Sequence, residues 1–130
     1  QDQALELVLA QASPQNLANP AFAQSVYERE QMGATSVYTG VALPHSDPKT
    51  VTHSEIVLVS LAKPVSWGQN QVKLIFLIAV AERDIKLFKE SLVALYALIE
   101  DQELMNQLSQ FQDGASLKAR LLEEVNINVR

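Results

Sequence analysis

The stretch VKLIFLIAV at residues 72–80 decides the fold class of this chain. It is nearly all apolar, and it is far shorter than the roughly 20 apolar residues that span a bilayer. A short apolar run of this kind is typical of a central β-strand that is covered on both faces. Two further strands are predicted upstream, at residues 37–43 and 55–61, and the segment 63–68 is expected to break the strand pattern.

Helical patterns lie on both sides of these strands in the sequence. Apolar residues spaced by three or four positions, with breakers such as Pro20 between the patterns, predict helices. The predicted helices cover residues 3–17, 21–31, 85–98, 103–111 and 115–124, and residues 126–129 form a tail or an edge strand. The expected fold is an α/β three-layer sandwich, with helices on both faces of a central mixed, largely parallel sheet of about four to five strands.

The composition indicates one globular domain over residues 1–130, with 48% hydrophobic residues to build its core. The net charge is −5 and the basic residues are spread along the chain, so this domain is not expected to contact nucleic acid or membrane directly. The absence of cysteine excludes disulfides, a thiolate nucleophile and a thiol-based zinc site, and it fits a cytoplasmic protein. The chain starts Gln1-Asp2-Gln3 and enters a helical pattern almost at once, which favours a domain excised from a longer protein.

The stretch YTGVALPH at residues 38–45 ends a predicted strand in a histidine. Pro44 fixes its own backbone and favours an extended Leu43, so His45 is presented at the end of the strand. Reactive groups of α/β sheets usually lie at strand ends, where loops converge. A neutral imidazole is a competent nucleophile near pH 7, so His45 is the candidate chemical centre, and the alternative is an exposed loop histidine.

The other histidine has a simpler interpretation. His53 could join His45 and Asp47 as a metal triplet, but loop spacing does not supply the convergent geometry that a metal site needs. His53 is therefore interpreted as a solvent-exposed residue, and no metal is expected.

Two apolar features are interpreted as packing. Trp67 follows a proline turn and is expected to pack against the sheet edge, although it could be a recognition aromatic. The leucine-rich face of the predicted helix at 85–98, which includes Leu87, is expected to belong to the core. It would be a partner groove only if part of it were exposed.

Three features occur in one order along the chain: ERE at residues 28–30 closing a helix, Thr35 in the next loop, and GVALPH at residues 40–45. This ordered set resembles the enzyme IIA domain of the bacterial sugar phosphotransferase system, mannitol/fructose class. The resemblance runs from about Ala21 onward. Within the family, KPVSWG at residues 63–68 and VKLIFL at residues 72–77 are most similar to the enzyme IIA-like modules at the C-terminus of BglG-type transcriptional antiterminators and related activators.

The resemblance implies a phosphohistidine relay, which is a phosphotransferase half-reaction that needs no cofactor. His45 would take the phosphoryl group from the histidine of the carrier protein HPr. Arg29 would hold the phosphoryl oxygens with its planar fork, and Thr35 would add a hydroxyl hydrogen bond. Without the resemblance, Arg29 beside Glu28 and Glu30 reads as a solvated helix end with local ion pairs.

One departure from the family bears on function. Transport members usually carry a second histidine near the start of the helix after the central strand, where this chain has Phe88. Loss of that imidazole disfavours onward transfer to a IIB domain and favours a regulatory module that works with other domains of its parent chain. Two alternatives stay open: a transport enzyme IIA that passes phosphate to a IIB domain during sugar uptake, and a degenerate interaction module that takes no phosphate. The presence of Arg29 and His45 argues against the last.

Overall fold

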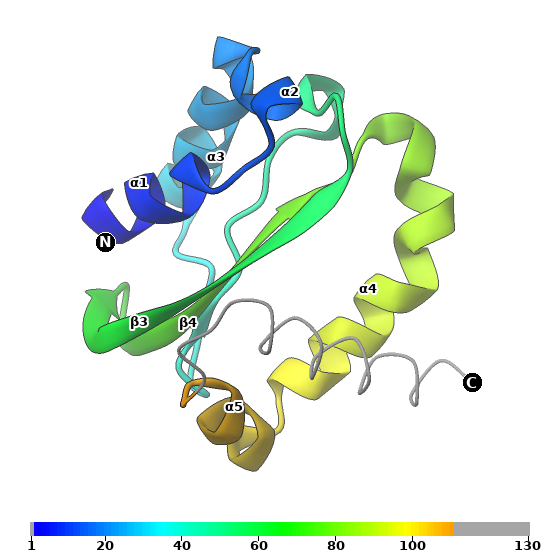
Figure 1. The fold of residues 1–130 in the computed structure, drawn as a ribbon. Helices are drawn as coiled ribbons and strands as arrows, with labels where there is room; N and C mark the ends of the chain where they lie inside the picture. The colour runs from blue at the N-terminus through cyan, green and yellow to red at the C-terminus, as the bar shows by residue number, and fades with distance from the viewer. Residues whose placement is uncertain (1, 111–130) are drawn as a thin grey trace.

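In the computed structural model, a four-stranded sheet lies between two layers of helices (Figure 1). The structure describes residues 2–110. The helix predicted at 115–124, the tail or edge strand at 126–129 and residue 111 of another predicted helix lie outside the described residues. The arrangement confirms the expected α/β three-layer sandwich.

The sheet contains β1 (Ser36–Val37), β2 (Val41–Ala42), β3 (Glu55–Trp67) and β4 (Asn70–Ala79), in the spatial order β1-β2-β4-β3. The β2–β4 pair is parallel, whereas the β1–β2 and β3–β4 pairs are antiparallel. The sheet is therefore mixed, as predicted, but it is not largely parallel. The reason is that β3 and β4 follow one another through a tight turn at Gly68, which has a φ of 63°, and a tight turn reverses the chain.

The strand predicted at residues 37–43 is instead a short hairpin. Residues 38–40 form a turn in which the Gly40 N–H donates to the Val37 carbonyl at 3.1 Å. Gly40 has a φ of 88°, a left-handed conformation that glycine adopts without strain. β1 therefore folds back on β2, and the chain then runs through Pro44 to His45.

The break expected at residues 63–68 is also wrong, because β3 continues to Trp67. Pro64 has no N–H to donate to a neighbouring strand. It is tolerated because β3 is an edge strand whose register with β4 shifts between Ser60 and Val65. β4 is the central strand that its apolar sequence predicts, with Leu74 and Phe76 facing one helical layer and Ile75 and Leu77 facing the other.

The helices α1 (Asp2–Ala10), α2 (Pro14–Leu17) and α3 (Pro20–Met32) lie on one side of the sheet. The single helix predicted at residues 3–17 is wrong, because Ser13 caps a new helix whose first residue is Pro14. Proline fits the first turn of a helix but not its interior. The helix predicted at residues 21–31 is confirmed as α3, which buries Phe22 and Val26 against the sheet.

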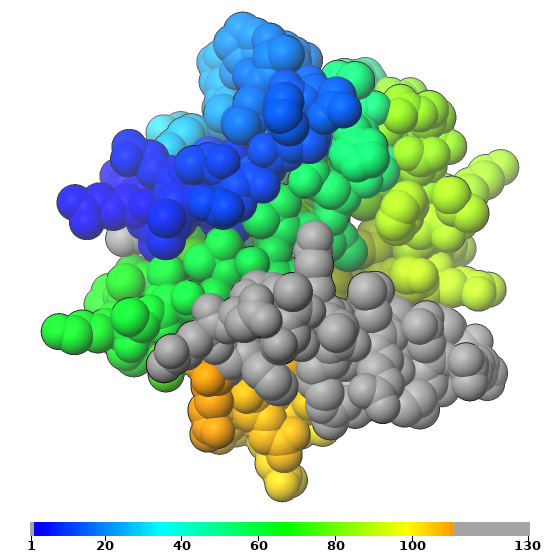
Figure 2. Space-filling model, viewed as in Figure 1, coloured from blue at the N-terminus to red at the C-terminus, as the bar shows by residue number. Residues whose placement is uncertain are grey.

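The helices α4 (Ile85–Ile99) and α5 (Gln102–Leu108) cover the opposite face, and short 3₁₀ turns occur at Pro48–Thr50 and Glu82–Asp84. In the space-filling view, the N-terminal helices and α4 occupy separate parts of the surface with β3 between them (Figure 2). Leu87 does not belong to the core, since 78% of it is exposed, and the buried residues of α4 all lie in its second half. No helix within residues 2–110 is long and apolar enough to cross a membrane.

Candidate functional site

His45 lies beyond the end of β2, where the chain still pairs with β4. It forms an isolated parallel bridge with Ile78. The Ile78 N–H donates to the Pro44 carbonyl at 2.9 Å, and the Ser46 N–H donates to the Ile78 carbonyl at 3.2 Å. These two bonds fix the backbone on both sides of His45, whose side chain is half-buried.

The His45 ring is held by one contact that decides its tautomer. Nδ1 lies 3.1 Å from the carbonyl oxygen of Leu43. A carbonyl oxygen only accepts hydrogen bonds, so Nδ1 carries the ring proton and Nε2 of the neutral ring keeps its lone pair. Nε2 is therefore the nucleophilic atom of this imidazole.

His45 lines an open pocket of about 310 Å³ beside β1. The other residues of the wall are Arg29, Ala34, Thr35, Ser36, Val37, Leu43 and Tyr96. We call this the His45 pocket. It brings the three candidate site residues together from a helix (Arg29), a loop (Thr35) and a strand end (His45).

Arg29 reaches the His45 pocket from the last turn of α3. Its Nη1 donates to the Gly33 carbonyl at 2.8 Å, which positions the guanidinium at the helix end. A guanidinium has five N–H donors, so the side chain can also bind an anion with its planar fork. Within residues 2–110, neither Glu28 nor Glu30 forms an ion pair with Arg29.

Glu30 has a structural task that the sequence analysis missed. Glu30 is 8% exposed, and its carboxylate accepts hydrogen bonds from the Thr35 N–H at 3.3 Å, the Trp67 indole N–H at 3.0 Å and the Thr35 hydroxyl. The Thr35 hydroxyl therefore donates its hydrogen bond to Glu30, and Thr35 also forms part of the pocket wall. The available signal is the spacing of four residues from Phe22 to Val26 to Glu30, which places Glu30 on the buried face of α3.

The hydrogen bond to Glu30 also gives the indole N–H of the buried Trp67 its acceptor. Trp67 is fully buried and belongs to the core between the sheet and the N-terminal helices, which confirms the packing interpretation.

Tyr96 is the pocket residue that the sequence gives no reason to select. It lies on α4 and is 45% exposed. Partial burial raises the pKa of Tyr96 above its ordinary value, so its hydroxyl stays protonated near neutral pH. Its placement depends on how α4 packs beside β2, which no local pattern specifies.

His53 lies in the loop before β3 and is exposed. Its backbone, rather than its ring, is bound: the side-chain oxygen of Asn16 accepts the His53 N–H at 3.0 Å, and the side-chain nitrogen of Asn16 donates to the His53 carbonyl at 2.7 Å. In the described part of the chain, no group of three or more histidine, aspartate, glutamate or cysteine side chains is arranged to hold a metal ion.

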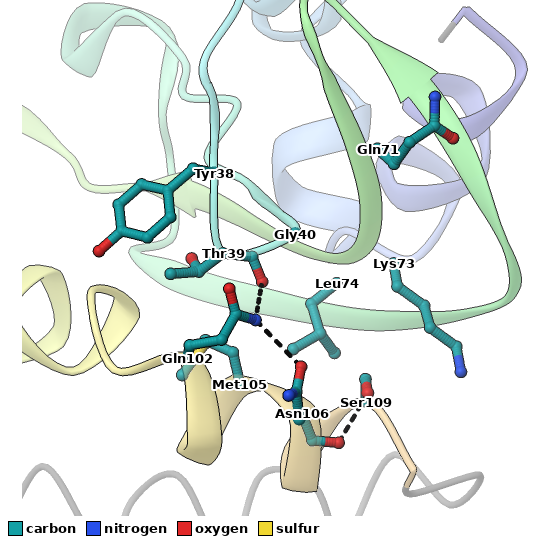
Figure 3. Close-up of a pocket in the computed structure, with 10 residues that line it drawn as sticks. All are labelled: Tyr38, Thr39, Gly40, Gln71, Lys73, Leu74, Gln102, Met105, Asn106 and Ser109. Atoms are coloured by element: carbon teal, nitrogen blue, oxygen red, sulfur yellow. Dashed lines mark hydrogen bonds between the residues drawn. The ribbon is translucent and has the colours of Figure 1, made fainter.

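A second hollow, of about 240 Å³, lies at the other end of β2, where α5 meets the turn before that strand (Figure 3). Several of its polar side chains are already hydrogen-bonded. Gln102 donates to the Thr39 carbonyl at 3.1 Å and to the Asn106 side chain at 3.0 Å, and Ser109 donates to the Asn106 carbonyl at 2.8 Å. This hollow contains no histidine, and the bond from Gln102 to Thr39 attaches α5 to the turn between β1 and β2.

The fold and the His45 pocket define a class of domain: an α/β/α sandwich that presents a histidine beside an arginine at the end of a sheet strand. The chain belongs to the EIIA 2 family of the phosphoenolpyruvate-dependent sugar phosphotransferase system, whose family model matches residues 1–124. This confirms the resemblance to the mannitol/fructose class of enzyme IIA.

Among curated proteins, the chain is similar to the transcriptional regulator ManR of Bacillus subtilis, with 32% identity over 99 residues, or 76% of this chain and 13% of ManR. It is 33% identical over 93 residues to the Probable licABCH operon regulator of Bacillus subtilis, covering 70% of this chain and 14% of that protein. It is 27% identical over 108 residues to multiphosphoryl transfer protein 1 of Escherichia coli, covering 78% of this chain and 12% of that protein. The chain thus spans about an eighth of the length of these relatives.

Solved structures share the fold. The crystal structure of IIA mannitol from Escherichia coli has a TM-score of 0.69 at 17% identity, with 93% of this chain and 87% of that chain covered. The enzyme IIA chain in the complex of IIAMTL with phosphorylated IIBMTL from Escherichia coli has a TM-score of 0.71 at 16% identity, with 95% and 87% covered.

Proposed function

We propose that this domain accepts a phosphoryl group on Nε2 of His45 from phosphorylated HPr and serves as a regulatory input of a sugar-responsive transcriptional antiterminator or activator. The proposal rests on the hydrogen bonding of the His45 ring and on its position beside Arg29. His45 Nδ1 is held by the Leu43 carbonyl, and the ring shares a pocket with the guanidinium of Arg29. The His45 pocket therefore combines a nucleophilic nitrogen with a cation that can bind phosphate.

The transfer balances without a cofactor or an added base. The lone pair of Nε2 attacks phosphorus, and the N–P bond of the donor histidine breaks with its electron pair staying on the donor ring. The proton on Nδ1 remains in its hydrogen bond to Leu43 throughout. Phosphoryl transfer has a loose transition state, so positioning and charge neutralisation by Arg29 supply most of the catalysis. Thr35, bound to Glu30, keeps the pocket wall in place.

Two observations support the regulatory assignment over transport. ManR and the licABCH operon regulator are named as regulators. The resemblance also places Phe88 where transport members usually have an imidazole, and the second histidine of this chain, His53, lies in an exposed loop. Partners would then be HPr and the other domains of the parent protein, in the cytoplasm where that carrier works.

The second candidate is a transport enzyme IIA that passes phosphate to a IIB domain. The similarity to IIAMTL in its complex with phosphorylated IIBMTL favours it, because the same fold engages a IIB domain there.

A labelling experiment separates these functions. The protein is incubated with phosphoenolpyruvate, enzyme I and HPr, and acid-labile, base-stable phosphate is measured before and after a IIB domain is added. We expect rapid labelling of the wild type and of the control His53→Ala, none of His45→Ala, and slow or no discharge to IIB. Rapid discharge would instead establish transport, and absence of label from the wild type would leave an interaction module.

A further inference from the structure

Tyr96 and His45 reach the same pocket from different layers of the fold. Leu43 packs in the hydrophobic cluster on the α4 side of the sheet. Side chains alternate along an extended chain, so His45, two residues later, projects toward that same side. α4 therefore brings Tyr96 to the face of the sheet on which the imidazole lies.

The Tyr96 hydroxyl is a hydrogen-bond donor on the wall of the His45 pocket. Partial burial favours its protonated form, and across residues 2–110 no hydrogen bond to it is formed. Tyr38 differs, because its hydroxyl lies 3.4 Å from the Glu100 carbonyl and outside the His45 pocket.

A phosphoryl group on His45 would need several donors. It carries three acceptor oxygens and a charge of about −1.5 to −2 at pH 7. Among the described residues of the pocket wall, the Thr35 hydroxyl is bound to Glu30, the Ser36 hydroxyl donates to the Trp67 carbonyl, and one arm of Arg29 is bound to the Gly33 carbonyl. The remaining N–H groups of Arg29 and the hydroxyl of Tyr96 are the side-chain donors that can face the group.

We propose that the Tyr96 hydroxyl donates a hydrogen bond to the phosphoryl group on Nε2 of His45 and, together with the cationic Arg29, stabilises its negative charge during transfer. The inference rests on the proposed phosphorylation of His45. Tyr96 thereby supplies a neutral donor from α4, the helix in which transport members usually carry their second imidazole. The phenol is a hydrogen-bond donor in its neutral form. Tyr96 therefore needs no change of protonation state to bind the phosphoryl group.

The test compares Tyr96→Phe with the matched control Tyr38→Phe, which removes the same hydroxyl outside the pocket. The rate of phosphoryl transfer from phosphorylated HPr is measured by rapid quench, and the phosphohistidine is observed by ³¹P NMR. A hydrogen bond to a charged group is strong enough that its loss slows transfer about tenfold. We expect this decrease and a shifted ³¹P resonance for Tyr96→Phe only, with the melting temperatures of both variants unchanged.

The outcomes distinguish this inference from the proposed function. Labelling of Tyr96→Phe within twofold of the wild-type rate, with the same ³¹P resonance, would remove Tyr96 from the site and leave phosphorylation of His45 intact. A wild type that takes no label on His45 would remove both.

Discussion

A single carbonyl oxygen, that of Leu43, decides which nitrogen of the neutral His45 ring keeps its lone pair. The backbone on both sides of His45 is bound to Ile78 of the central strand, so the ring and its hydrogen-bond partner are placed by the same rigid element. Arg29 is positioned in the same way, by its bond to Gly33 at the end of α3. Binding of a phosphoryl group would thus require little rearrangement of these side chains.

At this scale we predict that Arg29→Ala slows labelling of His45 more than tenfold. A charge-assisted hydrogen bond to phosphate contributes about 1.5–3 kcal/mol, and each 1.4 kcal/mol corresponds to a factor of ten. Rapid-quench labelling with phosphorylated HPr measures the rate. The matched control is Arg83→Ala, which removes an exposed arginine whose ion pair with Asp84 spans 3.9 Å, and its rate should equal that of the wild type. Equal rates for both variants would exclude Arg29 from the site.

The position of helix α4 is predicted correctly, but the prediction of which of its residues are buried is partly wrong. Its periodic leucines locate the helix, observed at Ile85–Ile99, almost to the residue. The same periodicity places Leu87 and Leu95 together in the core, whereas Leu87 is 78% exposed and Leu95 is 2% exposed. Burial depends on which turns of the helix lie over the sheet, and the apolar pattern does not contain that information.

These two leucines form a matched pair for measuring stability. Leu95→Ala should lower the free energy of unfolding by about 2–5 kcal/mol, because it leaves a cavity against the sheet. Leu87→Ala makes the same chemical change on the same helix at an exposed position and should change it by less than about 0.5 kcal/mol. Urea unfolding followed by circular dichroism measures both. Similar losses for the two variants would show that Leu87 is covered in the folded protein.

Across the whole molecule, one buried side chain joins the N-terminal helices to the start of β3. Asn16 is fully buried, and its oxygen accepts the N–H groups of Thr52 and His53 at 2.9 and 3.0 Å. Its nitrogen donates to the His53 carbonyl at 2.7 Å and to the Glu55 carboxylate at 2.6 Å. The Asn16 amide thus accepts two hydrogen bonds and donates two, so the loop before β3 and α2 hold each other in place.

Asn16→Ala should therefore be strongly destabilising. It removes the acceptor of two backbone N–H groups in a buried site, and each unsatisfied group costs about 1–3 kcal/mol. We expect a loss of at least about 2 kcal/mol, measured by urea unfolding. Asn106→Ala, at an exposed position of α5, is the control and should lose less than about 1 kcal/mol. A loss for Asn16→Ala no larger than that of the control would contradict the assigned network.

The sequence by itself determined the central strand β4, the helices α3 and α4, the family, and the position of His45 after a proline at a strand end. Each of these depends on residues close together in the chain, where periodicity and backbone preference act directly. Only the tertiary structure decided that Glu30 binds Trp67, that Leu43 selects the tautomer of His45, and that Tyr96 reaches the His45 pocket. The first and last of these contacts join residues far apart in the sequence, and the second depends on how a ring turns within a packed surface. Packing geometry sets such contacts, and local pattern does not.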